Sequence, residues 1–505
     1  MTREVKRDKV FPALDALLLL LILNFTLQPL TEPDFGWHLR TGLDLLRQGW
    51  ILPALDPYSH TMPDWPWVEH AWLTDLIIGT FYSWSGALGV ILFFAAVTAG
   101  AWLVASLSVR CNRTCRLLAC VLSLWVALPF LGARTQMVTL LGLAVLLVML
   151  ERNKNGQSRV LWLMPLLFLL WANLHGGFTA GLFLLGLVAA SSALAQVVVV
   201  RAPALAARFD EAILSWSAIG RLIVAAGIAS LVTLVNPYGW RLYGEIIDSL
   251  SNQFMLTSLQ EWQPLSLSSL AGRSCAVYLA GLGLAMAVWY RRIEPVRWML
   301  WAVFLILSLR HMRNIPFFLL VTLPLSAELL ERGLGQLASR LRLEVAHARR
   351  WLLAVAFAGG LFLVWLGPDH LQRVVQSGLQ PAEYFKSTAY PIEAVQWVQS
   401  HRELVGTRLY NDYPYGGFLL WWLPEEKIFI DGRMPAWRSG SRRIFQDYVA
   451  LSLTDPPNLS ILSVYSVDWA IVKKQSLLDE ALAREQTWRR EYEDGKVAIY
   501  VRQLE

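Results

Sequence analysis

Charged residues are scarce in this 505-residue chain: they make up 16% of the sequence, against 55% hydrophobic residues. Soluble domains carry about 25% charged residues, so this composition excludes an ordinary soluble enzyme. Cysteine is also rare, and the four cysteines are too few for a disulfide framework. The sequence has no low-complexity or heptad tract, which excludes the disordered, collagen-like and coiled-coil classes.

Long apolar runs are what the sequence has instead. The first run, residues 11–30, follows a basic N-terminus and lacks the cleavage site of a signal peptide, which favours a first membrane span. Further spans are predicted at residues 86–107, 117–132, 137–150, 160–172, 178–200, 222–236, 274–290, 297–309, 315–330 and 351–367. We therefore expect a polytopic α-helical membrane protein with about eleven transmembrane helices.

Basic residues are spread unevenly over the loops between these spans. They gather at the N-terminus and in every second loop, for example at Arg110, Arg152 and Arg291, whereas the intervening loops carry few. The positive-inside rule then places the N-terminus in the cytoplasm and residues 368–505 on the outer side of the membrane. The net charge of +6 is a topology signal and gives no reason to expect a nucleic-acid partner.

The chain divides into two parts of different composition. Residues 1–367 form the predicted membrane domain, whose first outer loop, residues 31–85, holds amphipathic stretches expected to lie in the membrane interface. Residues 368–505 alternate helical and strand-like patterns and predict a small extracytoplasmic α/β domain. In that domain we expect a helix at residues 391–404 and strands at residues 407–412, 426–433, 466–474 and 496–502.

Polar residues that hydrocarbon disfavours gather at the predicted outer ends of the spans. Such residues usually line cavities or bind ligands, although the polarity of an outer loop is an alternative explanation for any one of them. The turns at residues 173–177 and 310–314 are so short that their polar groups must stay near the helix ends, which favours one outward-facing site. The set is Glu32, Asp34, His38, Glu69, His70, Arg134, Gln136, Asn173, His175, Asn236, Tyr238, Arg310, His311, Arg313 and Asn314.

These regions carry motifs that resemble a known superfamily. They are EPDFGWHLRTG, DPYSHT and WVEHAWLTD in the first outer loop, RTQMVTLL, WANLHGGF, NPYGW and RHMRNIPFF at later span ends, and YNDYPYGGFLLWWLP and KIFIDGRMPAW in the tail. With the predicted architecture, they resemble the GT-C superfamily of membrane glycosyltransferases over nearly the whole chain. The similarity is closest to a set of mostly uncharacterised bacterial membrane proteins and more distant to protein O-mannosyltransferases and aminoarabinose transferases.

The resemblance implies that a sugar moves from a polyprenyl-phosphate-linked donor to a hydroxyl of a lipid, glycan or protein acceptor on the extracytoplasmic face. It also implies that the acidic motif falls on Glu32 and Asp34, with Asp34 as the catalytic base and Glu32 or Glu69 as the second carboxylate. Capping of the following helix is the alternative role for Asp34. A single carboxylate base predicts direct displacement with inversion.

The remaining roles follow from what such a donor requires. Its phosphate needs cations, which we assign to Arg310, Arg313, Arg134 and Arg40, with contact to lipid headgroups as the alternative. The sugar and acceptor hydroxyls are assigned to His38, His70, Asn173, His175, His311, Asn314 and Asn236. No cofactor is predicted with certainty, and a divalent metal bound by His38, His70, His175 and Glu69 is left open.

Rival functions share parts of this pattern. A transporter or flippase for lipid-linked glycans is expected to carry internal repeats and polar residues at mid-membrane, and the sequence shows neither. A non-catalytic scaffold of an envelope assembly complex predicts that the acids and arginines are dispensable. A polysaccharide polymerase or ligase uses the same donor chemistry and stays open.

Overall fold

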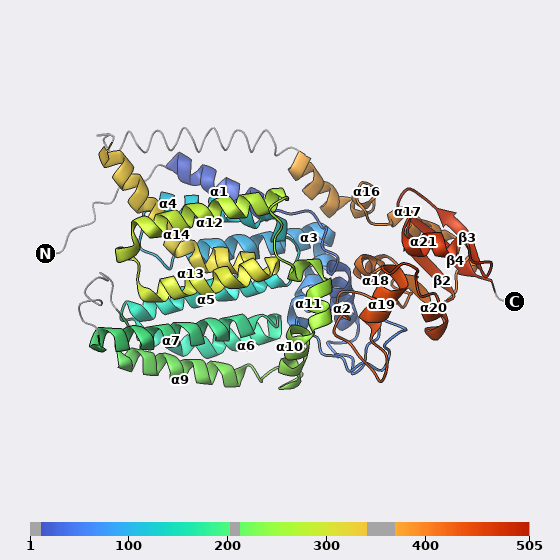
Figure 1. Cartoon of the computed structure of the whole chain (residues 1–505), viewed down its shortest axis with the longest axis horizontal. Helices are drawn as coiled ribbons and strands as arrows, with labels where there is room; N and C mark the ends of the chain where they lie inside the picture. The colour runs from blue at the N-terminus through green and yellow to red at the C-terminus, as the bar shows by residue number, and fades with distance from the viewer. Residues whose placement is uncertain (1–11, 202–212, 341–368, 504–505) are drawn as a thin grey trace.

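The computed structural model describes residues 12–201, 213–340 and 369–503. Over these ranges the molecule is elongated, with long helices bundled at one end and short strands at the other (Figure 1). Helices α2 (Phe35–Arg47), α10 (Arg241–Ser251) and α11 (Gln253–Ser258) lie between the two parts. The expected order of a helical membrane region followed by a small domain of strands and helices is confirmed.

The bundle consists of helices that run alternately toward and away from the strands. They are α1 (Pro12–Thr26), α3 (Trp72–Ser106), α4 (Arg113–Ala127), α5 (Gln136–Lys154), α6 (Met164–Leu174), α7 (Phe178–Arg201), α9 (Trp216–Val232), α12 (Leu270–Val288), α13 (Pro295–Arg310) and α14 (Ile315–Arg340). Within the described ranges, six segments are long and apolar enough to cross a membrane, and three shorter apolar helices accompany them. The count of eleven spans is not confirmed, and the span predicted at residues 351–367 lies outside the described residues.

Loops rich in basic residues meet at the end of the bundle remote from the strands. Arg113 ion-pairs there with Asp15 at 3.2 Å, and Lys154 ion-pairs with Glu294 at 2.5 Å. These loops therefore share one end of the bundle, which agrees with the alternation of charge along the sequence. The side of the membrane on which this end lies stays a prediction.

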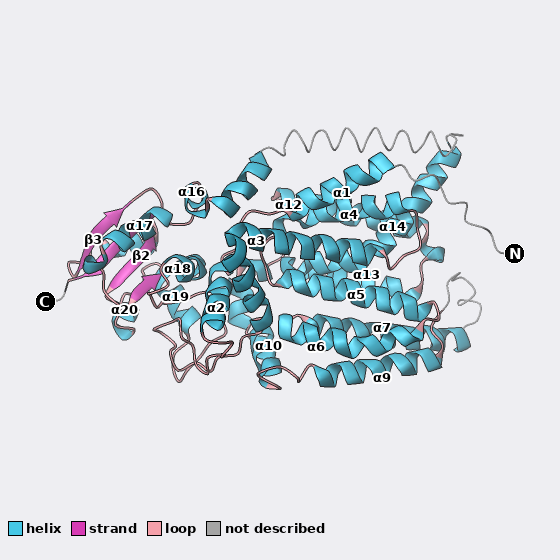
Figure 2. Cartoon of the chain, turned by 180° about the vertical axis from the view of Figure 1, so that it is seen from behind, coloured by secondary structure: helices cyan, strands magenta, loops and turns pink. Residues whose placement is uncertain are grey.

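The C-terminal part contains a sheet whose strand order, over the described residues, is β1-β2-β4-β3. Strand β1 (Leu409–Asn411) pairs parallel with β2 (Trp469–Lys473), and β4 (Val497–Arg502) pairs antiparallel with β2 and with β3 (Trp488–Glu493). The strands lie far from the bundle (Figure 2). The accompanying helices are α16 (Pro381–Lys386), α17 (Ile392–Ser400), α18 (Gly416–Trp422), α19 (Ile444–Ser452), α20 (Ser460–Val464) and α21 (Leu477–Leu482).

Most of the elements predicted for this part are present, but the strand predicted at residues 426–433 is wrong. That stretch makes one isolated bridge, to Ser59 of the first outer loop, and joins no strand of the described sheet. The side chain of Asn411 substitutes for a strand ladder: its Oδ1 accepts from the Phe429 nitrogen at 2.9 Å and its Nδ2 donates to the Ile430 oxygen at 2.8 Å. An amide side chain thus fixes a segment whose apolar pattern imitates a strand. Strand β3 was not predicted.

The first outer loop shares a hydrophobic core with the tail. The His60 ring lies 2.8 Å from the Leu409 oxygen through Nε2, and the Thr61 hydroxyl donates to the Phe429 oxygen at 2.7 Å. Loop residues in this core are Trp37, Tyr58, Met62 and Trp67. The domain boundary predicted at residues 367 and 368 lies outside the described residues, but the loop and the tail pack as one body.

Helix α2 is packed between the bundle and the tail. Gly36 of α2 lies so close to the carbonyl of Gly417 in α18 that a Cβ at Gly36 would overlap it. A Cβ at Gly417 would likewise overlap the Pro33 carbonyl, so the two glycines permit the close contact between α2 and α18. Phe35 meets Trp421 edge-on at 5.2 Å, whereas Trp50 after the helix is exposed. The tail thus covers the first part of the apolar stripe that was expected to face a membrane interface.

Candidate active site

The acidic pair lies where the first outer loop, the bundle and the tail meet. Asp34 directly precedes α2, yet its side chain makes no capping hydrogen bond to that described helix, so capping does not explain it. The carboxylate instead lies against Gly432 of the tail, where a Cβ would overlap it. Burial, and then the negative charge of Glu32, raise the pKa of Asp34 to about 7. Asp34 is thus ready to exchange a proton near neutral pH.

Glu32 forms an ion pair with Arg134, just before α5. Burial raises the pKa of Glu32, and the charge of Arg134 opposes that shift. The Tyr390 hydroxyl donates to the oxygen of Thr31, the residue before Glu32, at 3.1 Å, so a tail residue contacts this edge of the site. The two acids therefore differ: Glu32 has a cationic partner and Asp34 has none among the described residues.

A buried cluster of His38, Glu69 and Asp75 lies beside the acidic pair. His38 approaches Asp75 Oδ1 through Nδ1 at 2.6 Å and Thr135 Oγ1 through Nε2 at 3.4 Å. The Ala71 nitrogen donates to Glu69 Oε1 at 3.1 Å. One donor atom from each member lies within 4.8 Å of those of the other two. Within the described residues, these three could hold a metal ion.

His70 and His175 line the neighbouring space. Their ring centroids are 5.5 Å apart, and the His70 ring is 6.4 Å from that of His38. His175 Nδ1 lies 2.8 Å from the Thr139 hydroxyl, which accepts from the Trp171 indole at 3.1 Å. The cluster that could hold a metal shares His38 and Glu69 with the set left open from the sequence, and it contains Asp75 where that set has His70 and His175.

Arg313 lies near the acidic pair, and so does Arg134. Arg313 Nη1 is 2.8 Å from Glu261 Oε1, and its guanidinium carbon lies 4.2 Å from the ring centre of Trp262. The charge of Glu261 is among the causes that raise the pKa of Asp34, so the Arg313–Glu261 pair lies within electrostatic reach of that carboxylate. Two of the four arginines assigned to the phosphate are thus placed beside the acids.

The other two arginines are placed differently. Arg310 is exposed at the end of α13. Arg40 pairs with Asp44, one turn further along α2, at 2.9 Å. Neither makes a hydrogen bond or ion pair with the acidic residues of the site in the described part of the chain, and their role as phosphate ligands stays a prediction.

Several predicted sugar-binding residues are engaged at helix ends. The amides of Asn173, Asn236 and Asn314 donate to backbone carbonyls, and Asn236 does so within its own turn. The His311 ring contacts the Trp262 oxygen at 2.6 Å through Nδ1. These contacts stabilise the helix ends, and the assignment of the four residues to sugar or acceptor hydroxyls stays a prediction.

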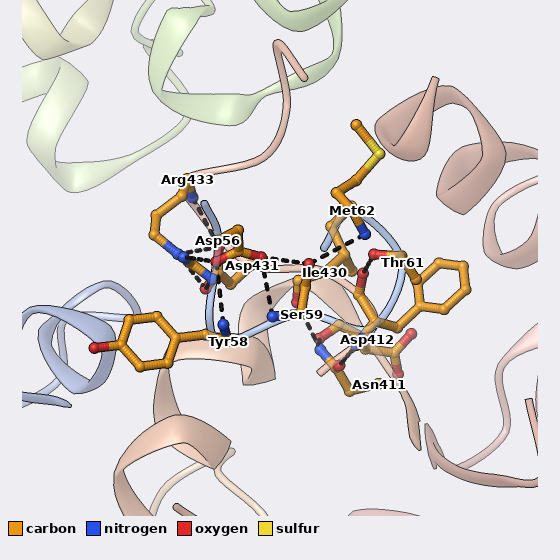
Figure 3. A network of polar contacts seen from close by, with 11 residues as sticks. Asp56, Tyr58, Ser59, Thr61, Met62, Asn411, Asp412, Ile430, Asp431 and Arg433 are labelled. Atoms are coloured by element: carbon orange, nitrogen blue, oxygen red, sulfur yellow. Dashed lines mark hydrogen bonds and ion pairs between the residues drawn. The ribbon is translucent and has the colours of Figure 1, made fainter. Parts of the chain in front are cut away.

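A second polar network fixes the loop to the tail (Figure 3). Arg433 bridges Asp431 at 2.7 Å and Asp56 at 2.8 Å, and all three side chains are at most 5% exposed. The guanidinium is surrounded, at 5.1–5.9 Å from the ring centres, by Trp37, Tyr58, Trp67 and Trp437. This network holds Gly432 over Asp34, so the Asp-Gly-Arg motif positions the site from the tail.

Sequence reasoning missed Asp75, Glu261 and the pairing of Asp56 with Arg433. For Asp75 a signal existed, because an acid in the run WLTDLIIGTF is costly in an apolar helix. This signal was not recognised, because the same run also has the pattern of an amphipathic helix, in which an acid is ordinary. Asp56 and Arg433 lie in motifs noted in the sequence, but the partners of Asp56 and Glu261 are distant along the chain, so the sequence does not show that these residues pair.

This arrangement of spans, loop and tail is the GT-C fold, and the protein is a multi-pass membrane protein with that fold. Two structures of the archaeal oligosaccharyltransferase from Archaeoglobus fulgidus are similar to it at 12% identity over 92% of this chain and 69% of theirs. One is tethered with an acceptor peptide containing the NVT sequon (TM-score 0.53), and the other holds an inhibitory peptide and a dolichol-phosphate (TM-score 0.51).

ArnT from Cupriavidus metallidurans, bound to undecaprenyl phosphate, aligns over 97% of both chains at 14% identity with a TM-score of 0.42. No protein-family model matches the chain, and no curated protein matches its sequence. At these identities the likeness establishes the fold.

Proposed function

We propose that this protein is a GT-C-type glycosyltransferase that moves a sugar from a polyprenyl-phosphate-linked donor to an acceptor hydroxyl. The observation that carries the proposal is Asp34, a carboxylate with no capping role and a raised pKa at the junction of loop, bundle and tail. An attacking hydroxyl requires a base of this kind. The dolichol-phosphate in a structure of similar fold supports a lipid-phosphate donor.

The transfer is a single displacement. The acceptor oxygen bonds to the anomeric carbon while the bond from that carbon to the phosphate oxygen breaks, so the configuration inverts. The hydroxyl proton passes to the Asp34 carboxylate, and the polyprenyl phosphate leaves with the electron pair. A pKa near 7 makes Asp34 a better proton acceptor than an ordinary carboxylate while leaving much of it ionised at neutral pH.

Arg313 and Arg134 supply the positive charge for the departing phosphate. Guanidinium groups match phosphate in bidentate fashion and stabilise charge that develops as the bond breaks. Both side chains keep about a third of their surface exposed, so both remain accessible to a ligand. His70 and His175 orient hydroxyl groups of the donor sugar. The positive-inside pattern supports a site on the extracytoplasmic face of a bacterial inner membrane.

Comparative mass spectrometry of envelope lipids, glycans and glycoproteins tests this function. A strain without the gene is compared with strains that express the wild type, Asp34→Asn or Asp44→Asn at equal membrane abundance. Asp44 is the matched control, because it lies on the same helix and pairs with Arg40. We expect a glycosylated product to disappear on deletion and to return with the wild type and Asp44→Asn only. An unchanged product profile after deletion would refute glycosyl transfer, and full rescue by Asp34→Asn would refute the assigned base.

A further inference from the structure

The cluster of His38, Glu69 and Asp75 has an arrangement that the transfer mechanism does not use. His38 comes from α2, Glu69 from the loop before α3 and Asp75 from the first turn of α3. The three residues are 4%, 3% and 0% exposed. Their donor atoms lie within 4.8 Å of one another. Two ligands of one cation with bonds of about 2.0–2.2 Å lie at most about 4.4 Å apart, so small side-chain movements would bring these donors to one ion.

The charges of the cluster do not balance. Glu69 and Asp75 bring two carboxylates into a buried space, and neither has a lysine or arginine partner in the described ranges. Asp75 Oδ2 is buried and has no hydrogen-bond partner among the described residues. A buried carboxylate oxygen without a partner is costly, and such sites are usually satisfied by a cation or a proton. The orphan oxygen is an observation independent of the spacing of the donors.

The orientation of His38 suits a metal ligand. Its Nδ1 faces the carboxylates, and its Nε2 lies 3.4 Å from the Thr135 hydroxyl. Metal-binding histidines commonly use one ring nitrogen for the metal and the other for a hydrogen bond of this type. A hydrogen bond also fixes the Glu69 carboxylate, because its Oε1 accepts from the Ala71 nitrogen.

We propose that His38, Glu69 and Asp75 bind a divalent transition-metal cation, Zn²⁺ or Mn²⁺. One imidazole with two carboxylates favours these ions over Mg²⁺ and Ca²⁺, which prefer sites made only of oxygen ligands. Three protein ligands leave a coordination position for water. The cation neutralises the buried acids and fastens α2 to α3, where a Cβ at Gly42 would overlap the Asp75 carbonyl. The site does not depend on the proposed transfer reaction.

Metal content and metal-dependent stability test the proposal without any measurement of activity. The full chain is purified in detergent without chelator, and bound metals are quantified by inductively coupled plasma mass spectrometry. It is then stripped with EDTA, and thermal unfolding is followed during titration with ZnCl₂ or MnCl₂. We expect one equivalent of Zn or Mn per chain and a midpoint that rises by several degrees when the ion is restored.

Variants separate the three ligands from their neighbours. Asp75→Asn and Glu69→Gln preserve side-chain shape and should weaken binding more than about 100-fold, since loss of a ligand exceeds the 10–100-fold effect of losing a supporting contact. His70→Ala and Asp44→Asn should retain the metal. Size-exclusion chromatography and circular dichroism establish that each variant is folded. If Asp75→Asn fails to fold, Glu69→Gln carries the comparison.

Three results would overturn the proposal. The first is wild-type protein that holds neither metal and does not change its unfolding midpoint at millimolar Zn²⁺ or Mn²⁺. The second is a folded Asp75→Asn or Glu69→Gln variant that binds the metal as tightly as wild type. The third is a His70→Ala variant that loses the metal. The last result would restore the ligand set suggested by the sequence. None of these outcomes bears on Asp34, so failure of the metal site is distinguishable from failure of the proposed function.

Discussion

Both ends of the helical bundle bury charged side chains, but the charges are arranged differently. At the end remote from the tail, acids and bases alternate in one chain of contacts. Glu294 contacts Lys154 at 2.5 Å and Arg297 at 3.1 Å, while Glu328 contacts Arg297 and Arg332. Each acid in this chain therefore lies between two cations.

At the end beneath the tail, Asp34, Glu69 and Asp75 have no lysine or arginine partner in the ranges that the structure describes. Buried ions that compensate one another hold helices in a fixed arrangement, whereas uncompensated acids reduce stability and are typical of sites that bind or react. The comparison therefore assigns a structural role to one end and a functional role to the other. Substitutions at the two ends should change different measured quantities.

The largest effect is expected for Asp34→Asn. Loss of a general base typically costs about 10²–10⁴-fold in rate, and we expect the turnover of purified protein on its identified donor and acceptor to fall by this amount. The unfolding midpoint should change little, because Asp34 makes no capping bond and has no ion-pair partner among the described residues. A large loss of stability with retained turnover would show that Asp34 has a structural role and would contradict the functional role assigned to this end of the bundle.

Arg313→Ala should have the next largest effect, and Arg47→Ala is its matched control. A charge-assisted hydrogen bond contributes about 1.5–3 kcal/mol, so loss of Arg313 should raise the KM for the lipid-phosphate donor by about 10–100-fold. Arg47 is exposed, is not among the arginines assigned to the phosphate, and should have a much smaller effect. Steady-state kinetics with varied donor concentration measures both variants. Equal effects on donor and acceptor KM would remove Arg313 from the phosphate site.

Glu328→Gln tests the opposite end and should act on stability alone. It leaves Arg297 and Arg332 without this acid, and the three side chains are 13–25% exposed. Breaking a fully buried pair costs about 3–5 kcal/mol and an exposed one less than about 1 kcal/mol, so we expect about 1–2 kcal/mol here. Thermal unfolding in detergent measures the loss. A fall in turnover of the folded variant would contradict the structural role of this end.

The smallest effect concerns the joint between loop and tail. Burial lowers the pKa of His60 from 6.5 to about 4, so the folded protein favours its neutral form. Stability from this group is fully present above pH 6.5 and is lost progressively as the pH falls toward 4. We expect a loss of about 1 kcal/mol at pH 5, reduced by the partial exposure of the ring. Thermal unfolding at pH 7.5 and 5 should show a smaller pH dependence in His60→Gln.

Much of the architecture could be predicted because apolar runs and the placement of basic residues act locally. Span segments, the order of membrane region and tail, and the clustering of polar groups such as Asp34, His38 and His175 at one end all follow from such patterns. The strand predicted around Phe429 failed, since the pattern of alternating residues could not reveal that Asn411 binds that backbone.

The site itself could be predicted only in part, because its assembly depends on contacts between distant residues. Glu32 and Arg134 were assigned separate roles and turn out to be one ion pair. Asp56 and Arg433 are 377 positions apart, so their motifs could be noted separately but their pairing could not be predicted. The amide of Asn236 bonds to backbone carbonyls at a helix end, a contact that the sequence does not reveal, and its role in sugar binding stays a prediction.

Gly432 against Asp34 has a consequence for the order in which the protein is made. Residue 34 leaves the ribosome long before residue 432, and the contacts of the loop with Leu409, Phe429 and Arg433 can form only after the tail has been synthesised. A nascent chain already inserted in the membrane therefore has an Asp34 carboxylate that lacks its contact with Gly432. The site is therefore completed at the last stage of biogenesis, so a product truncated before residue 409 would occupy the membrane without the tail residues that cover Asp34.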